Sequence, residues 1–166
     1  MYMSSNSVHS VNNTRELYTE ATRQSLMHHI VKYFGEPDLF LSERVSPDIC
    51  VEIAVIEPTP NQNFYTLITL GMGAHKMNVP EDLADQQIER GELVMLLDPD
   101  WEVPSHEDQF YWPLRLLKTL ARQSIEDPEE FLSWGYRWSN GEPFCEETEL
   151  NSIVLNTLFK AFDTEA

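Results

Sequence analysis

Residues 49–56, with the sequence ICVEIAVI, decide the fold class of this chain. Isoleucine or valine occupies every second position from 49 to 55. A two-residue period rich in β-branched side chains is typical of a β-strand. Pro58, Pro60 and two asparagines then mark a turn, and residues 64–70 form a second predicted strand. We therefore predict an antiparallel hairpin over this part of the chain.

A helical pattern precedes the hairpin. Residues 13–34 predict an amphipathic helix that ends before Gly35 and Pro37, two residues that stop helices. Its apolar side chains recur at helical spacing: Leu26, Met27, Ile30, Val31 and Phe34. The region from residue 13 onward therefore begins with a helix and continues into strands.

Further elements follow the hairpin. The apolar run 93–97 is typical of a strand covered on both faces, and residues 81–91 fit a short helix or a loop. Residues 111–122 predict a second helix with Pro113 in its first turn. Short strands are expected near 134–138 and 150–155. This order of helix, strands, helix and strands indicates an α+β fold with a mostly antiparallel or mixed sheet.

Length and composition suit one soluble domain. The chain has 166 residues, 42% of them hydrophobic, which is enough for a substantial core. We expect a disordered leader over residues 1–12 and a single domain over residues 13–166. No signal peptide is predicted, and no window holds the ~20 apolar residues of a membrane helix, so a cytoplasmic protein is expected. Cys50 and Cys145 form no disulfide framework, and Cys50 is predicted to be a small buried hydrophobe.

Net charge is the most distinctive property of the composition. Eleven Lys and Arg oppose 28 Asp and Glu, which gives a formal net charge of −17. Nucleic acids and anionic membranes bind proteins through cations, so neither is an expected partner. A basic protein would be attracted instead.

The chain carries no pattern that predicts catalysis, a cofactor or a bound metal. The adjacent His28 and His29 diverge on a helix and cannot share one metal ion. Residues 106–108, His-Glu-Asp, lie in a polar loop without a second cluster of ligands. Glycine-rich phosphate loops and nucleophile elbows are absent. A metal-dependent hydrolase or nuclease with a site near His75 or His106 remains the alternative from the enzyme class.

The segment from Glu126 to Glu149 combines acids with aromatic residues. It holds eight acids and one base, a net charge of 1 − 8 = −7, and five aromatic residues. Aromatic anchors within a charged rim are typical of protein interfaces, although alternate aromatics also form the inner face of a strand. The residues predicted to bind a partner are Trp134, Tyr136, Trp138, Glu142, Glu146, Glu147 and Glu149.

Several motifs in this order resemble the Suppressor of Fused domain family. The most specific are EPT (57–59), TLITLGM (66–72) and the stretch WPLRLLKTLAR (112–122). The resemblance extends over roughly residues 37–155. Cys50 stands where many members of the family carry a histidine.

The resemblance implies a fold and a function. The implied fold is a curved, mostly antiparallel or mixed sheet with flanking helices. Members of the family usually close the sheet with another strand after the position where this chain ends, so the sheet is expected to be completed differently here or the chain to be truncated. The implied function is protein binding without catalysis. This chain resembles the compact bacterial members of the family. That resemblance implies that it is an immunity protein that neutralises a polymorphic toxin. The alternative is a regulatory adaptor that sequesters a transcription or signalling protein, as the eukaryotic members do.

Overall fold

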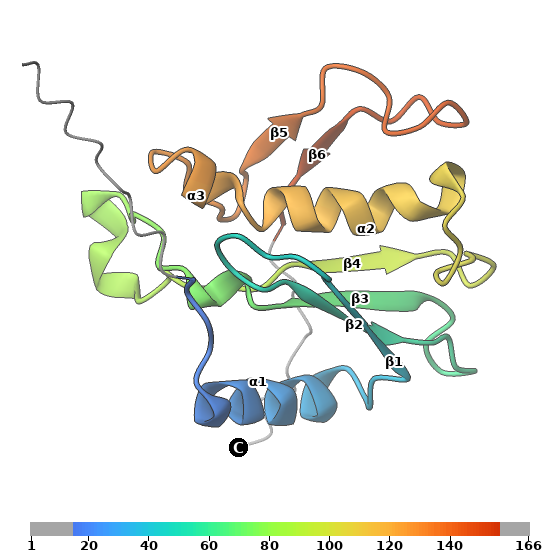
Figure 1. Ribbon diagram of the computed structural model, residues 1–166, viewed down its shortest axis with the longest axis horizontal. Helices are drawn as coiled ribbons and strands as arrows, with labels where there is room; N and C mark the ends of the chain where they lie inside the picture. The colour runs from blue at the N-terminus through green and yellow to red at the C-terminus, as the bar shows by residue number, and fades with distance from the viewer. Residues whose placement is uncertain (1–14, 157–166) are drawn as a thin grey trace, which may run out of the picture.

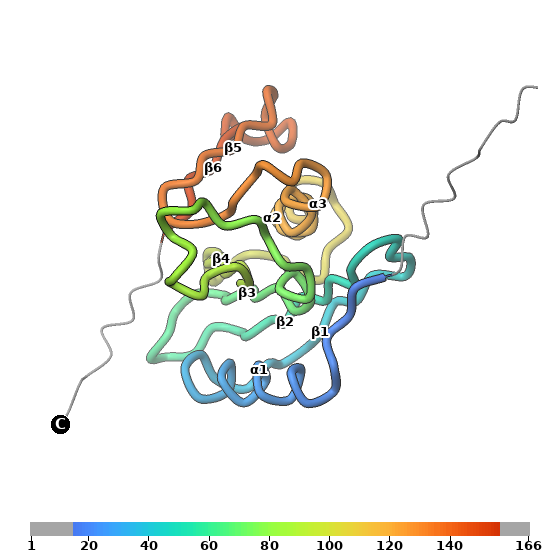
Figure 2. Tube along the Cα trace, turned by 90° about the vertical axis from the view of Figure 1, so that its left-hand side faces the viewer, coloured from blue at the N-terminus to red at the C-terminus, as the bar shows by residue number. Residues whose placement is uncertain are grey.

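The computed structural model describes residues 15–156, so the leader expected over residues 1–12 lies outside the described residues. The described chain is arranged in layers (Figures 1 and 2). Helix α1 (Glu20–Tyr33) covers one face of a four-stranded sheet, helix α2 (Asp108–Leu120) covers the other, and a two-stranded sheet lies beyond α2. This arrangement confirms the α+β fold class.

The main sheet is antiparallel throughout and has the strand order β1-β2-β3-β4. Strands β2, β3 and β4 coincide with the predicted strands. Strand β1 is not predicted by the sequence, because four residues are too few to establish a two-residue period. The strands are β1 (Leu39–Ser42), β2 (Glu52–Ile56), β3 (Tyr65–Leu70) and β4 (Val94–Leu97).

Strand β2 is buried on both faces. Ile53 and Val55 belong to the apolar core on the α2 side, and Ala54 and Ile56 belong to the core on the α1 side. The prediction that the 93–97 strand is covered on both faces is wrong, because Leu96 is 48% exposed. Among the described strands, β4 pairs only with β3, so it lies at an edge of the sheet.

Helix α1 begins later than predicted. The segment before it is extended, and Glu16 forms a parallel bridge with Ile49 beside the start of β2. The Thr19 side chain caps the helix by accepting the backbone N–H of Thr22 at 3.1 Å. A threonine in this position satisfies an N–H that has no partner within the helix, so the helix starts at Glu20.

Helix α2 begins at Asp108, earlier than predicted. Pro113 therefore lies in the second helical turn instead of the first, and it donates no bond to the carbonyl group four residues before it. None of the helices among the described residues combines the length and the apolar character of a membrane-spanning segment. The shorter helical elements are η1 (Met72–Ala74), η2 (Glu81–Gln86) and α3 (Gln123–Glu126).

The second sheet pairs β5 (Arg137–Ser139) with β6 (Ser152–Val154). The predicted strand over 134–138 is mostly wrong, because Gly135 has a φ of +81° and the N–H of Tyr136 donates to the carbonyl of Ser133. This turn takes residues 134–136 out of the strand. Trp138 lies in the middle of β5 and packs against the core.

A partly buried carboxylate, that of Glu92, fixes the turn after β3. It accepts hydrogen bonds from the hydroxyl groups of Tyr18 and Thr69, both at 2.6 Å, and from the backbone N–H of Gly71 and Gly73. Burial raises the pKa of Glu92, while these hydrogen bonds oppose the shift. The carboxylate thereby ties the segment before α1 to the sheet.

Candidate functional site

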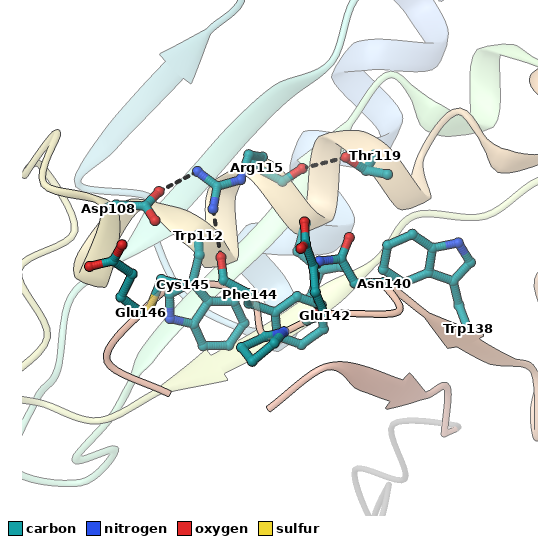
Figure 3. A pocket seen from close by; sticks show the side chains of 12 residues that line it. Asp108, Trp112, Arg115, Thr119, Trp138, Asn140, Glu142, Phe144, Cys145 and Glu146 are labelled. Carbon is teal, nitrogen blue, oxygen red and sulfur yellow. Dashed lines mark hydrogen bonds and ion pairs between the residues drawn. The ribbon is translucent and has the colours of Figure 1, made fainter. Parts of the chain in front are cut away.

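A groove runs between helix α2 and residues 138–146, which comprise the end of β5 and the first part of its connection to β6 (Figure 3). Its volume is about 640 Å³. We call it the α2 groove. Asp108, Trp112 and Arg115 line it from the helix, at the spacing of i, i+4 and i+7 that places side chains on one helical face.

Backbone hydrogen bonds hold the far wall of the groove. The N–H of Phe144 donates to the carbonyl of Leu150, and the N–H of Asn140 donates to the carbonyl of Asn151, each at 2.8 Å. The carbonyl of Phe144 in turn accepts a hydrogen bond from the guanidinium of Arg115 at 2.7 Å. These bonds place the loop over α2 although the two segments are distant in sequence.

Three aromatic rings in the groove are nearly parallel. The rings of Trp112 and Phe144 have centroids 5.0 Å apart and an interplanar angle of 10°. The rings of Trp138 and Phe144 have centroids 6.5 Å apart and an interplanar angle of 2°. Phe144 is buried, whereas Trp112 and Trp138 are partly exposed. The groove therefore holds a row of aromatic rings, of which those of Trp112 and Trp138 are partly accessible to a ligand.

The charges in the groove do not cancel. Arg115 is its one lining cation, and the guanidinium is already paired with Asp108 at 2.5 Å. Glu142 and Glu146 are exposed, and within residues 15–156 neither carboxylate has a hydrogen bond or an ion pair. Three carboxylates and one guanidinium thus leave the groove with a net charge of 1 − 3 = −2.

The structure brings some of the predicted binding residues together and separates others. Trp138, Glu142 and Glu146 line the α2 groove. Glu147 and Glu149 are exposed in the same loop but do not line it. They stay predicted partner-binding residues outside this groove.

Trp134 and Tyr136 have different surroundings from Trp138. Trp134 is 73% exposed, lines a separate groove beside β4, and donates its indole N–H to Asn156 at 3.1 Å. Tyr136 packs against the core, and burial together with a hydrogen bond to Glu130 raises the pKa of its hydroxyl. Tyr136 therefore contributes to the packing of the fold, and both residues stay predicted partner-binding residues outside the α2 groove.

Two further grooves lie elsewhere on the described chain. The larger, of about 910 Å³, is next to β4 and contains Trp134. The other, of about 720 Å³, lies between β1 and the loop that precedes α2. The α2 groove is smaller than either, but it is the one that combines parallel aromatic rings with unpaired carboxylates.

The histidines considered for a metal site are dispersed. Nδ1 of His75 lies 3.0 Å from the Glu16 carboxylate, and the His106 ring packs near Tyr111. His28 and His29 are exposed on α1. Among the described residues, no three His, Cys, Asp or Glu side chains are grouped so that they could hold a metal ion.

Cys50 departs from its predicted environment. It is partly exposed, whereas Cys145 is buried, and both are free thiols. The residues on either side of it, Ile49 and Val51, are fully buried. The prediction that Cys50 is a buried hydrophobe is therefore wrong.

A comparison with protein-family models places most of this chain in one family. Residues 47–166 match the family described as Suppressor of fused protein (SUFU). The match covers well over half of the chain and includes both walls of the α2 groove. No curated protein and no solved structure matches the chain.

Proposed function

The chain belongs to the Suppressor of fused family, a family of protein-binding domains, and from this premise we propose that it binds a basic polypeptide through the α2 groove. The observation that carries the proposal is the pair of unpaired carboxylates, Glu142 and Glu146, beside a row of aromatic rings. Aromatic side chains supply most of the binding energy at many interfaces. Charged groups around them favour a partner of the opposite sign.

The charge of the whole chain supports the same kind of partner. A net charge of −17 attracts a cationic protein over distances comparable to the Debye length, which is about 8 Å at physiological salt. Such steering raises the association rate more than it lowers the dissociation rate. It suits a protein that must capture its partner quickly.

Within the family, the role that fits these features best is that of an immunity protein that neutralises a basic toxin. Rapid capture through complementary charge is what such a role requires. A cytosolic location belongs to the proposal, because Cys50 and Cys145 are free thiols and the cytosol keeps thiols reduced. A regulatory adaptor would use the same groove for a basic segment of a signalling protein.

Capture from native cell extract tests the proposal. The wild-type chain and a Glu142→Lys/Glu146→Lys variant are immobilised, and the retained proteins are identified by mass spectrometry at about 0.15 M salt. Glu126→Lys/Glu129→Lys is the matched control, since it makes the same charge change at two exposed residues that neither line the groove nor belong to the predicted binding residues. We expect a basic protein on the wild type and on the control, and its loss from the groove variant.

Two other outcomes would contradict the proposal. If the groove variant retains the same protein as the wild type, the binding surface lies elsewhere. If the retained protein is acidic, or none is retained, the chemistry proposed for the partner is wrong. A captured partner whose gene is next to the gene for this chain, and which is toxic when produced alone, would support the immunity role over the adaptor.

A further inference from the structure

The geometry of the α2 groove points to a specific anchor: we infer that it binds an arginine side chain of the basic partner, stacked on Trp138 and paired with Glu142. The inference rests on the proposed function, because it concerns the same groove (Figure 3). It goes further in naming which cation the groove accepts and which side chains discriminate it from others.

The aromatic row is suited to a flat ligand. The rings of Trp112 and Trp138 each lie within 10° of parallel to the ring of Phe144, so the three faces share nearly one orientation. The guanidinium of arginine is planar and stacks on aromatic faces, whereas the ammonium of lysine is a compact and strongly hydrated charge. Parallel faces therefore offer more contact to arginine than to lysine.

The groove already holds one guanidinium. Arg115 donates one N–H to the carboxylate of Asp108 and another to the carbonyl of Phe144, at 2.5 and 2.7 Å. The side chain of Arg115 thus shows that a guanidinium fits among these groups. Asp108 is paired with Arg115, but among the described residues no cation is paired with Glu142 or Glu146. A second guanidinium, from the partner, would supply that cation.

Two indole N–H groups in the groove are available to donate hydrogen bonds to a ligand. Trp101 and Trp134 each donate the indole N–H to a protein oxygen. Within the described chain, the indole N–H groups of Trp112 and Trp138 have no protein acceptor, although both side chains line the groove. A bound peptide backbone can accept these hydrogen bonds while its arginine occupies the space above the rings.

Two matched peptides test the inference on the full chain. One is a glycine–serine peptide with arginine at every second position, and the other has lysine at the same positions, so their net charges are equal. Affinities are measured by calorimetry, and the four indole N–H signals of the protein are followed by NMR. We expect the arginine peptide to bind about fivefold more tightly than the lysine peptide.

The NMR signals locate the contact without any substitution. Those of Trp112 and Trp138 should shift with the arginine peptide, while those of Trp101 and Trp134 should stay in place, since neither lines the groove. Trp138→Ala should remove the preference for arginine, and Trp134→Ala is the control that should keep it. Glu142→Gln/Glu146→Gln removes charge from exposed side chains without disturbing the core, and should weaken both peptides.

The results that would contradict the arginine anchor differ from those that would contradict the proposed function. Equal affinity for the two peptides, with both weakened by Glu142→Gln/Glu146→Gln, would overturn the arginine anchor and leave the proposed function standing. An arginine preference that persists in Trp138→Ala, in a variant whose circular dichroism is unchanged, would overturn the stacking. If neither peptide shifts a groove signal, both the inference and the proposed function are contradicted.

Discussion

Gly71 occupies a position that no other residue can adopt without strain. Its φ is +125°, and a Cβ atom added to it would lie 1.9 Å from the carbonyl oxygen of Cys50. We predict that Gly71→Ala lowers the free energy of unfolding by at least about 3 kcal/mol, because the clash is with backbone atoms and adds to the dihedral strain. Urea denaturation of the purified variant measures this change.

Gly141→Ala is the matched control for Gly71→Ala. Gly141 also has a positive φ, +81°, but nothing lies within 4 Å of an added Cβ atom. Only the dihedral strain remains, so a loss of about 1 kcal/mol is expected. Equal losses in the two variants would show that the close approach to Cys50 does not determine the requirement for glycine at residue 71.

At the scale of elements, Arg122 joins the end of helix α2 to the connection between β1 and β2. Its guanidinium contacts Glu43 at 2.7 Å and Asp48 at 3.0 Å, and all three side chains are at most 15% exposed. We predict that Arg122→Met lowers the free energy of unfolding by about 3 kcal/mol at neutral pH, since two poorly solvated carboxylates then lose their cation. Arg122→Lys should lose less, because it keeps the charge but not the forked geometry.

The effect of Arg122→Met should depend on pH. Burial opposes ionisation of Glu43, but the hydrogen bonds from Arg122 and its other neighbours lower the pKa of that carboxyl below its usual value of 4.5. A lowered pKa contributes stability that is present above pH 4.5 and is lost as the pH falls through the folded-state pKa. The difference between wild type and Arg122→Met should therefore shrink below pH 4.5, and a constant difference would contradict this assignment.

The sequence predicts elements better than it predicts the groove. Strand β2 is evident because its β-branched residues alternate, and it stays apolar on both faces. The local composition of acidic and aromatic residues is enough to single out three residues of the groove: Trp138, Glu142 and Glu146. Asp108 and Trp112 are missed, because their contact with the 138–146 loop forms only when α2 packs beneath that loop. Trp134 does not line this groove, because the turn at Gly135 directs it to another one.

The net charge of −17 opposes compaction of the chain. Added salt screens this repulsion, so we predict that the melting temperature rises by about 3 °C between roughly 0.02 and 0.5 M sodium chloride. Differential scanning calorimetry measures the change. Glu126→Gln/Glu129→Gln removes two exposed charges and should show a smaller rise from a higher starting temperature. A melting temperature that falls with salt would mean that specific ion pairs outweigh the net repulsion.

The family match starts at residue 47, but helix α1 and strand β1 come before it. Without them, Ala54, Ile56, Ile68 and Leu70 would lose the apolar cover that Ile30 and its neighbours provide, and β2 would become an unprotected sheet edge. A fragment trimmed to the boundaries of the match should aggregate during expression. A fragment intended for crystallisation should instead begin ahead of Glu16, so that Tyr18 remains available to the carboxylate of Glu92.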